Sequence, residues 1–294
     1  MNTPHSSHPH IASILQTTTL YLKREDLGLH GSHKGRAIPK MIDYAQKAFN
    51  HHHFTISSTG NAALSAIQKT IEHNSDKKNT PIFLEVYIGH RIPPKKKAAL
   101  TDLSKDPHIT IRQVSNPKQQ AFQKGQAENT TYLRQSTDSQ APEFYHRLAA
   151  EITTTHKTDH IFVATSSGTT AQGIGEYLVA HNKKTKLHIV QTTACPTIAS
   201  YFDKKFIKTE NSIATCIGDK VGHRKKTLIG LIEKTKGSGW VVSDKEILQA
   251  QNILEKELNE TITPNQALSL AGALKAKKSG WTLGESTTCI ISGK

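Results

Sequence analysis

The sequence has few cysteines and no long apolar run. Its 294 residues include three cysteines, Cys195, Cys216 and Cys289, which lie far apart and form no C-x-x-C pair. Any disulfide scheme leaves one of them unpaired, so a reducing compartment is favoured and we expect a cytoplasmic protein. No apolar stretch is long enough to span a bilayer, and the N-terminal segment lacks the basic and apolar regions of a signal peptide. We therefore expect neither secretion nor a membrane partner.

Acidic residues are also scarce beside basic ones. The chain has 24 Asp and Glu against 38 Lys and Arg, for a formal charge of +14. Such an excess can bind phosphate backbones, but here the basic residues are spread in short runs, and aromatic residues make up only 6% of the chain. Solvated loops and helix ends explain short basic runs equally well, so a nucleic-acid-binding protein is the less favoured alternative. Anionic small substrates remain compatible with the charge.

The sequence does contain a regular alternation of β-rich runs and helical patterns. The β-rich runs occupy residues 20–23, 53–57, 81–88, 108–114, 160–165, 186–192, 239–243 and 287–292. Between them, segments such as 38–49 and 243–258 place apolar side chains on one helical stripe, and "SDKE" predicts a helix start near Ser243. This alternation predicts an α/β fold with mainly parallel sheets. We expect two α/β domains, a larger one of residues 1–39 and 136–294 and a smaller one of residues 40–135.

Three of the apolar runs end in small or hydroxyl-bearing residues directly before a helical pattern begins. They lie in "LYLKREDLGLHGSHKGRA" (20–37), "FTISSTGNAALSAI" (54–67) and "IFVATSSGTTAQGIGEYL" (161–178). A helix N-terminus presents unpaired backbone N–H groups and a partial positive charge, so each loop is a potential anion site. One such loop is commonly a helix cap and nothing more. Three in one chain indicate a ligand with several anionic groups.

In this order the loops resemble those of pyridoxal-phosphate enzymes of the tryptophan synthase β-like superfamily, also called fold type II. "GSHKGRA" (31–37) is similar to the S-x-K motif that carries the Schiff-base lysine, and "SSTGNAA" (57–63) to the asparagine loop that holds the substrate carboxylate. "SSGTTAQG" (166–173) resembles the phosphate-binding loop, and "CIISGK" (289–294) the strand whose hydroxyl residue faces the pyridine nitrogen. The resemblance spans nearly the whole chain. It implies pyridoxal 5'-phosphate as cofactor, two three-layer domains with mainly parallel sheets, and a homodimer.

The resemblance also assigns roles to individual residues. It implies that Lys34 is catalytic and forms the Schiff base with the cofactor; burial and a helix N-terminus both favour the neutral amine that this requires. Ser292 would place a neutral hydroxyl opposite the pyridine nitrogen, which in this family accompanies β-elimination and replacement. The further cofactor-binding candidates are Asn61, Ser166, Ser167, Gly168, Thr169 and Thr170. The substrate-binding candidates are Ser58, Thr59, Gly60 and Asn61.

Several positions depart from the family pattern. Serine and threonine occupy phosphate-loop positions that are often glycine, His33 stands where phenylalanine is usual, and Gly35 replaces a common acidic residue. For His33 we favour a packing role over proton transfer, because no partner for proton transfer can be named. The three histidines at 51–53 have no matching ligands at metal spacing, so we expect no metal site.

The asparagine loop favours one activity within the family. "STGN" is typical of threonine synthase, so we predict a lyase of threonine biosynthesis that converts phosphohomoserine to threonine and phosphate. Ala62 and Ala63 follow Asn61, where dehydratases tend to carry histidine and cysteine synthases threonine and glycine. Threonine or serine dehydratase and cysteine synthase are the alternatives within the same chemistry. A catalytically silent binding protein with this fold is the alternative of another class.

Overall fold

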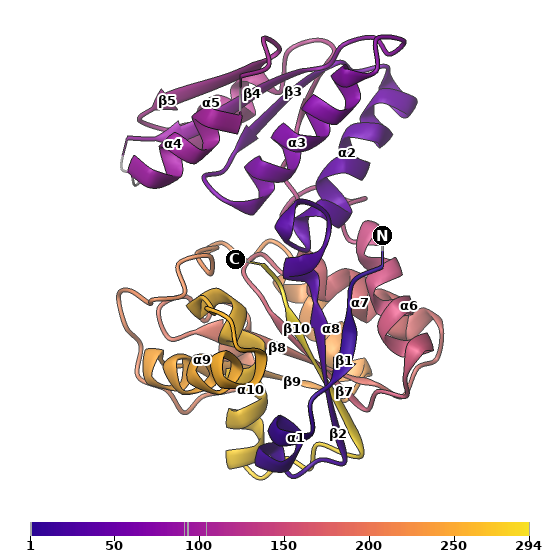
Figure 1. Ribbon diagram of the computed structural model, residues 1–294, viewed down its shortest axis with the longest axis vertical. Helices are drawn as coiled ribbons and strands as arrows, with labels where there is room; N and C mark the ends of the chain where they lie inside the picture. The colour runs from indigo at the N-terminus through magenta and orange to yellow at the C-terminus, as the bar shows by residue number, and fades with distance from the viewer. Residues whose placement is uncertain (1, 91, 93, 104, 294) are drawn as a thin grey trace. The chain divides into compact units, whose positions relative to one another are not determined.

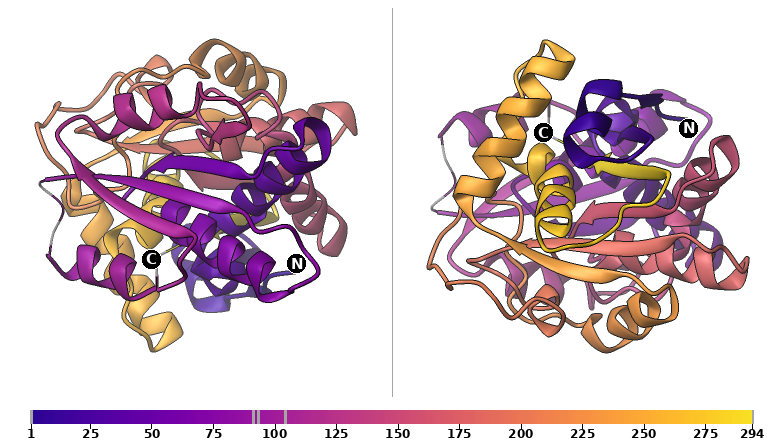
Figure 2. Two further views of the ribbon diagram at one scale, coloured as in Figure 1. Left: turned by 90° about the horizontal axis from the view of Figure 1, so that it is seen from above. Right: turned by 90° about the horizontal axis from the view of Figure 1, so that it is seen from below.

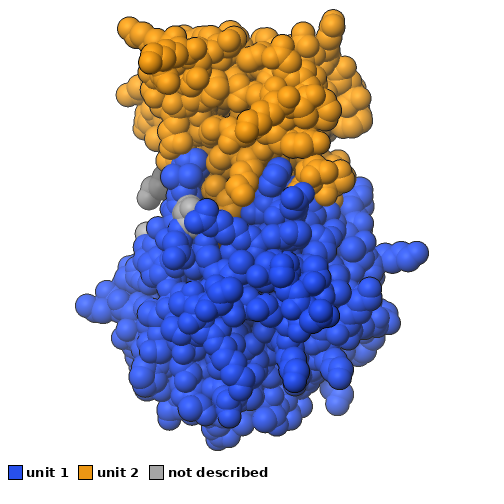
Figure 3. Space-filling model, turned by 90° about the vertical axis from the view of Figure 1, so that its right-hand side faces the viewer, with its two compact units in different colours: residues 1–33, 141–294 blue, residues 34–140 orange. Residues whose placement is uncertain are grey.

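A computed structural model describes residues 2–90, 92, 94–103 and 105–293 (Figure 1). The chain forms two compact units, of residues 1–33 with 141–294 and of residues 34–140 (Figure 3). The predicted α/β class with mainly parallel sheets is confirmed. All eight predicted β-rich runs form strands, whereas two strands of three residues each, at His5–Ser7 and Thr130–Tyr132, were not predicted.

Unit 1 is built on a six-stranded sheet in the order β1-β2-β10-β7-β8-β9. Its strands are β1 (His5–Ser7), β2 (Thr19–Arg24), β7 (His160–Ala164), β8 (Lys186–Thr192), β9 (Ser238–Val242) and β10 (Ser286–Ile291). All neighbours pair in parallel except β1, which is antiparallel to β2. The last strand of the chain, β10, lies between β2 and β7, so that Cys289 is in register with Leu22 on one side and Phe162 on the other.

Helices cover both faces of this sheet (Figures 1 and 2). They are α1 (Pro9–Leu15), α6 (His146–Thr155), α7 (Thr169–Ala180), α8 (Lys225–Lys234), α9 (Asp244–Leu258) and α10 (Pro264–Lys278), with short 3₁₀ turns η1 (Glu25–Leu27), η2 (Leu29–Gly31), η3 (Glu143–Tyr145) and η4 (Ala199–Tyr201). Buried side chains of α1, α9 and α10 join those of the strands in one hydrophobic core, while α6, α7 and α8 pack side by side. Apolar burial on both faces explains why these strands read as nearly continuous apolar runs.

Helix α9 shows how local sequence sets an element boundary. The hydroxyl of Ser243 accepts a hydrogen bond from the Glu246 backbone N–H, and the Glu246 carboxylate accepts one from the Ser243 N–H at 2.7 Å. This reciprocal pair is the predicted capping box. The stripe of Ile247, Ala250 and Leu254 is then buried in the core.

Unit 2 contains a four-stranded, fully parallel sheet in the order β5-β4-β3-β6. The strands are β3 (His53–Ser57), β4 (Phe83–Gly89), β5 (Ile109–Val114) and β6 (Thr130–Tyr132), and the helices are α2 (Lys34–Phe49), α3 (Asn61–Ser75), α4 (Pro94–Leu103) and α5 (Pro117–Lys124). Helix α5 packs on β3, where the Thr55 hydroxyl donates to the Ala121 carbonyl at 2.9 Å.

The unit boundaries differ from the expected domain boundaries. We expected the chain to pass between domains after residues 39 and 135, whereas the units divide after residues 33 and 140. The physical reason at the first crossing is that α2 is one continuous helix from Lys34, with Pro39 inside it. Residues 34–39 therefore belong to unit 2 together with the rest of their helix. In the described part of the chain, no helix is both long and apolar enough to cross a membrane.

Candidate active site

Lys34 is the first residue of α2, and a glutamine holds its amine. The side chain is half-buried, and Nζ donates a hydrogen bond to Oε1 of Gln135 at 2.7 Å. Gln135 follows β6 and is only 7% exposed. Sequence reasoning missed this residue, because its segment has no motif and 101 positions separate it from Lys34. The predicted Schiff-base lysine is therefore not a solvated surface lysine, since its amine has a defined partner.

The asparagine loop follows β3, the strand that pairs with β6 in the sheet of unit 2. Strand β3 ends at Ser57, Gly60 is the N-cap of α3, and Asn61 is its first residue. Within the loop, the Gly60 N–H donates to the Ser58 hydroxyl at 3.2 Å, and Ser58, Thr59, Gly60 and Asn61 are all half-buried. A glycine cap supplies no side-chain acceptor to the first N–H groups of the helix, which is the arrangement that suits a carboxylate. Because β3 and β6 are parallel neighbours, this loop and Gln135 leave the sheet at the same edge.

The predicted phosphate loop joins β7 to α7 in unit 1. Its glycine, Gly168, is the N-cap of α7 with φ +93°, and a Cβ there would lie 3.0 Å from Leu228 Cδ2. A side chain at this position would be both strained and crowded, so glycine is required. Thr169 and Thr170 begin the helix and are buried. The Ser167 and Thr169 hydroxyls lie 3.1 Å apart and share a hydrogen bond.

Ser166 has a different task from the rest of that loop. Its hydroxyl accepts hydrogen bonds from the backbone N–H groups of Gly218 and Asp219, at 3.1 and 3.2 Å. Gln191, which is fully buried, donates to the Ser166 carbonyl at 3.4 Å. The Ser166 side chain therefore joins the phosphate loop to residues 218–219. The prediction that Ser166 binds the cofactor then applies to its backbone.

A buried arginine at the phosphate loop was missed by sequence reasoning. Arg224, the N-cap of α8, is 8% exposed. Its Nε donates to the Thr169 hydroxyl at 3.1 Å and its Nη1 to Oε1 of Gln172 at 3.0 Å. Arg224 belongs to the short basic run "HRKK" at 223–226, and a solvated helix end describes the exposed Lys225 and Lys226 of that run. Arg224 is buried instead, because α8 packs on α7 and turns this side chain inward.

Ser292 lies beside His33, the residue that precedes Lys34. The backbone N–H and the ring Nδ1 of His33 lie 2.9 and 2.7 Å from the Ser292 carbonyl oxygen. Ser32 and Gly293 form an antiparallel bridge next to them. The His33 ring also lies 6.0 Å from the Tyr145 ring, so packing describes only part of what the side chain does. The first and last motifs of the sequence are thus adjacent in unit 1.

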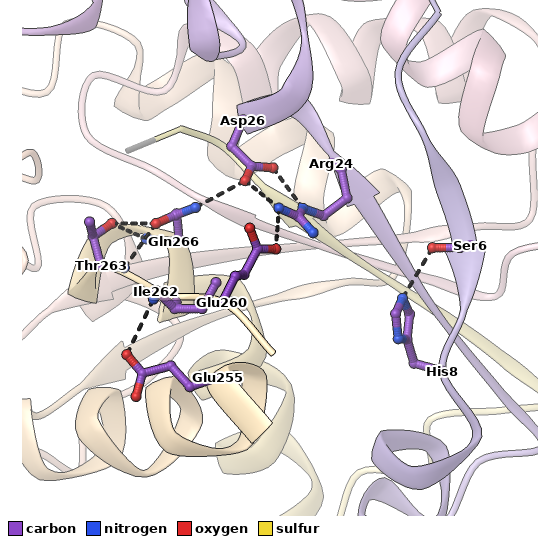
Figure 4. A network of polar contacts seen from close by, with 9 residues as sticks. All are labelled: Ser6, His8, Arg24, Asp26, Glu255, Glu260, Ile262, Thr263 and Gln266. Atoms are coloured by element: carbon purple, nitrogen blue, oxygen red, sulfur yellow. Dashed lines mark hydrogen bonds and ion pairs between the residues drawn. The ribbon is translucent and has the colours of Figure 1, made fainter. Parts of the chain in front are cut away.

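A buried polar network fixes the start of the lysine loop, the segment of residues 25–33 between β2 and Lys34 (Figure 4). Arg24, at the end of β2, binds the Asp26 carboxylate through Nε at 2.9 Å and Nη2 at 2.8 Å. Gln266, from the first turn of α10, donates to the same carboxylate at 3.0 Å, and Glu260 accepts from Arg24 at 2.6 Å. The hydrogen bond to Asp26 raises the pKa of Arg24. Because β2, β10 and β7 are parallel neighbours, this loop, Ser292 and the phosphate loop all follow the carboxyl ends of adjacent strands.

These residues fit a phosphorylated, aldehyde-bearing cofactor. Unit 1 offers a positive-φ glycine, a helix N-terminus and a buried guanidinium, which together suit a phosphate group. Unit 2 offers a half-buried lysine amine and a second helix N-terminus. The fold and these loops define the class of the protein as a two-unit α/β protein with anion sites where parallel strands meet helices.

A family profile described as pyridoxal-phosphate dependent enzyme matches residues 1–293, so the chain belongs to that family. It is a pyridoxal-phosphate-dependent enzyme of fold type II, and its cofactor is pyridoxal 5'-phosphate. No curated protein matches the chain by sequence.

Solved structures share the fold at low sequence identity. A maize serine racemase superposes with a TM-score of 0.82 at 19% identity, covering 99% of this chain and 87% of that one. An L-serine ammonia-lyase from Rhizomucor miehei gives 0.81 at 16% identity, covering 100% and 93%. Threonine deaminase isoform 2 from Solanum lycopersicum gives 0.80 at 16% identity, covering 100% and 79%. None of these three is a threonine synthase, and at such identities the likeness shows the fold alone.

Proposed function

We propose that the protein is an amino-acid lyase in which Lys34 holds the cofactor aldehyde and moves the α-proton of the substrate. The observation that carries the proposal is the Lys34 amine, half-buried at the start of α2 and held 2.7 Å from Gln135 Oε1. When bound, the cofactor supplies an electron sink for the electron pair left at the substrate α-carbon. Gln135 accepts a hydrogen bond from the amine and so restricts where its remaining protons point.

The other predicted residues have binding roles in this proposal. The backbone N–H groups at the start of α7, with the Thr169 and Thr170 hydroxyls, bind the phosphate, and Arg224 adds a buried positive charge. The N–H groups and hydroxyls of residues 58–61 bind the substrate carboxylate. The Ser292 hydroxyl faces the pyridine nitrogen. A neutral partner leaves that nitrogen unprotonated more readily than a carboxylate would, which favours elimination over transamination.

Two substrate classes compete within the proposal. The "STGN" loop at residues 58–61 supports phosphohomoserine and therefore threonine synthase. The structural likeness to an L-serine ammonia-lyase and a threonine deaminase supports dehydration of serine or threonine as the second candidate. A homodimer in the cytoplasm, which the family resemblance and the unpaired cysteines support, completes the proposal.

A panel of substrates separates these activities. Purified protein saturated with pyridoxal phosphate is given phosphohomoserine, L-threonine, L-serine, or O-acetylserine with sulfide, and phosphate, keto acid, cysteine and D-amino acids are measured. Threonine and phosphate from the first substrate alone identify a threonine synthase, whereas keto acid from serine or threonine identifies a dehydratase. D-serine without keto acid overturns the lyase assignment. Cofactor binding with no turnover of any substrate supports the silent binding protein instead.

The role of Lys34 has its own test. Borohydride reduction of the protein with bound cofactor fixes the cofactor to the lysine that carries it, and peptide mapping identifies the residue. We expect the label on Lys34 and no label in Lys34→Ala. A matched control is Lys40→Ala, because Lys40 lies in the same helix and is exposed. Label on any other lysine of the wild-type protein contradicts the proposal.

A further inference from the structure

His33 joins the lysine loop to the end of the chain through a single carbonyl group. Its backbone N–H and its ring Nδ1 both approach the carbonyl oxygen of Ser292, at 2.9 and 2.7 Å. A carbonyl oxygen only accepts hydrogen bonds and has two lone pairs. Nδ1 must therefore carry a hydrogen and donate it, and the two donors of His33 use both lone pairs of that oxygen.

The neighbouring residues hold the same two segments together. Ser32, which is fully buried, forms an antiparallel bridge with Gly293. Gly293 has φ +147°, a backbone conformation that favours glycine. Residues 292–293 thus run antiparallel to residues 32–33, and the bond from the His33 N–H to the Ser292 carbonyl belongs to this pairing. The position of residues 292–293 depends on the lysine loop as well as on β10.

The contact also narrows the proton-transfer role considered for His33 to its other ring nitrogen, Nε2. An Nδ1 that donates its hydrogen to a carbonyl cannot act as a base at that nitrogen. A phenylalanine, which the family pattern carries at this position, could pack against Tyr145, but its side chain could not donate to Ser292. Histidine in place of phenylalanine at position 33 therefore adds a side-chain hydrogen bond. Its acceptor is Ser292, the residue whose hydroxyl is assigned to the pyridine nitrogen.

We propose that His33 is a positioning residue, which acts through the Ser292 carbonyl to hold the Ser292 hydroxyl toward the pyridine nitrogen of the cofactor. The inference rests on the function proposed for Ser292. His33, the residue before Lys34, thereby orients the hydroxyl group that faces the pyridine nitrogen. That hydroxyl belongs to Ser292, 259 positions further along the chain.

The contact itself is tested without cofactor. Nitrogen-15 NMR of histidine-labelled protein should show a hydrogen on Nδ1 of His33, and the Nε2–H tautomer would overturn the contact. The backbone amide of residue 33 donates to the Ser292 carbonyl at 2.9 Å, and its hydrogen exchange should rise roughly tenfold in His33→Phe and His33→Gln, which lack a side-chain donor at the Nδ1 position. His33→Asn, whose amide nitrogen lies near the Nδ1 position, should restore most of the protection.

The effect on the cofactor is tested with a double-mutant cycle. His33→Phe should weaken pyridoxal phosphate binding roughly fivefold in the wild-type background and less than twofold in Ser292→Ala, because both changes remove one interaction. Additive losses would overturn the proposal. A matched control is His181→Phe, since Nδ1 of the exposed His181 binds the Tyr177 carbonyl at 2.9 Å at the end of α7, and we expect it to leave cofactor affinity unchanged.

The two tests separate this inference from the proposed function. If Ser292→Ala alone leaves both the affinity and the absorbance spectrum of the bound cofactor unchanged, the role of Ser292 fails although the contact seen by NMR stands. If the tautomer is wrong while Ser292→Ala perturbs the spectrum, the role of Ser292 stands and His33 does not position it.

Discussion

Gln135 accepts a hydrogen bond from Lys34, from which it lies 101 positions away in the sequence. Both belong to unit 2, where Gln135 follows β6 and Lys34 begins α2. The glutamine carbonyl therefore restrains the one amine on which the proposed chemistry depends.

Replacing that glutamine should impair catalysis more than folding. Gln135→Leu removes the acceptor at similar volume, and we expect kcat to fall roughly 2- to 10-fold, the usual effect of losing a hydrogen bond between neutral groups. Gln135→Glu keeps an acceptor and should retain more activity than Gln135→Leu. The measurement is steady-state turnover together with thermal unfolding. Equal activity of Gln135→Leu and the wild type would contradict a role for this contact.

Arg224 should matter for the phosphate of the cofactor and not for its ring. Because its guanidinium lies at the start of α7, Arg224→Gln should weaken pyridoxal phosphate binding roughly 10- to 100-fold. Pyridoxal, which lacks the phosphate, should bind the variant and the wild type with similar affinity. Fluorescence titration measures both, and Lys226→Gln, from the exposed part of the same run, is the matched control. A similar loss for both ligands would show that Arg224 acts only on folding.

Gly168 is expected to tolerate no side chain. Its φ of +93° and the contact of 3.0 Å with Leu228 predict that Gly168→Ala lowers the free energy of unfolding by about 1–3 kcal/mol. Gly230, in the middle of α8, has open space around the Cβ position, so Gly230→Ala should raise the free energy of unfolding by about 0.5–1 kcal/mol. Urea denaturation of the two variants checks whether the free energy of unfolding changes in opposite directions. Equal effects of both changes would argue against strain at Gly168.

Two buried histidines should make the stability of the protein depend on pH. Trp240 Nε1 donates to His188 Nδ1 at 3.2 Å, so His188 donates from Nε2 to His160 Nδ1 at 2.9 Å. Burial lowers the pKa of His160 to about 4 and that of His188 well below 6.5. Both rings are therefore neutral in the folded protein, whereas an unfolded histidine binds a proton below about pH 6.5.

The sign of the effect follows from this difference. The unfolded state binds more protons between pH 6.5 and the folded pKa values, so stability is constant above that range and is lost as the pH falls through it. For His160, the loss should be roughly 2 kcal/mol of unfolding free energy between pH 6.5 and 5, and His188 adds to it in the same direction. Urea denaturation at pH 7 and pH 5 measures the loss, and His160→Gln should reduce its pH dependence. An identical pH dependence in that variant would rule out His160 as a source.

The parts of the fold that sequence reasoning recovered are those encoded by neighbouring residues. The alternation of apolar runs and helical stripes predicted the α/β class and eight of the strands, because side-chain periodicity of 2 and 3.6 is a local property. The capping box at Ser243 and Glu246 is local as well. The two missed strands, β1 and β6, have three residues each, which is too short for any period to show. The helix N-terminus expected at Lys34 is found there, because α2 begins at that residue, whereas the expected domain boundary lay after residue 39.

By itself, then, the sequence determined the fold class, the order of the loops and the family, because each rests on residues that are contiguous in the chain. Only the tertiary structure decided which side chains assist those loops. Gln135 reaches Lys34, Arg224 reaches Thr169 and His33 reaches Ser292 across 101, 55 and 259 positions. For His33 and Ser292 the physical reason is that the parallel strands β2 and β10 bring their carboxyl ends to one edge of a sheet, although they lie at opposite ends of the chain. Lys34 and Arg224 lie at the N-termini of helices. A hydrogen bond between two such ends leaves no pattern in either segment.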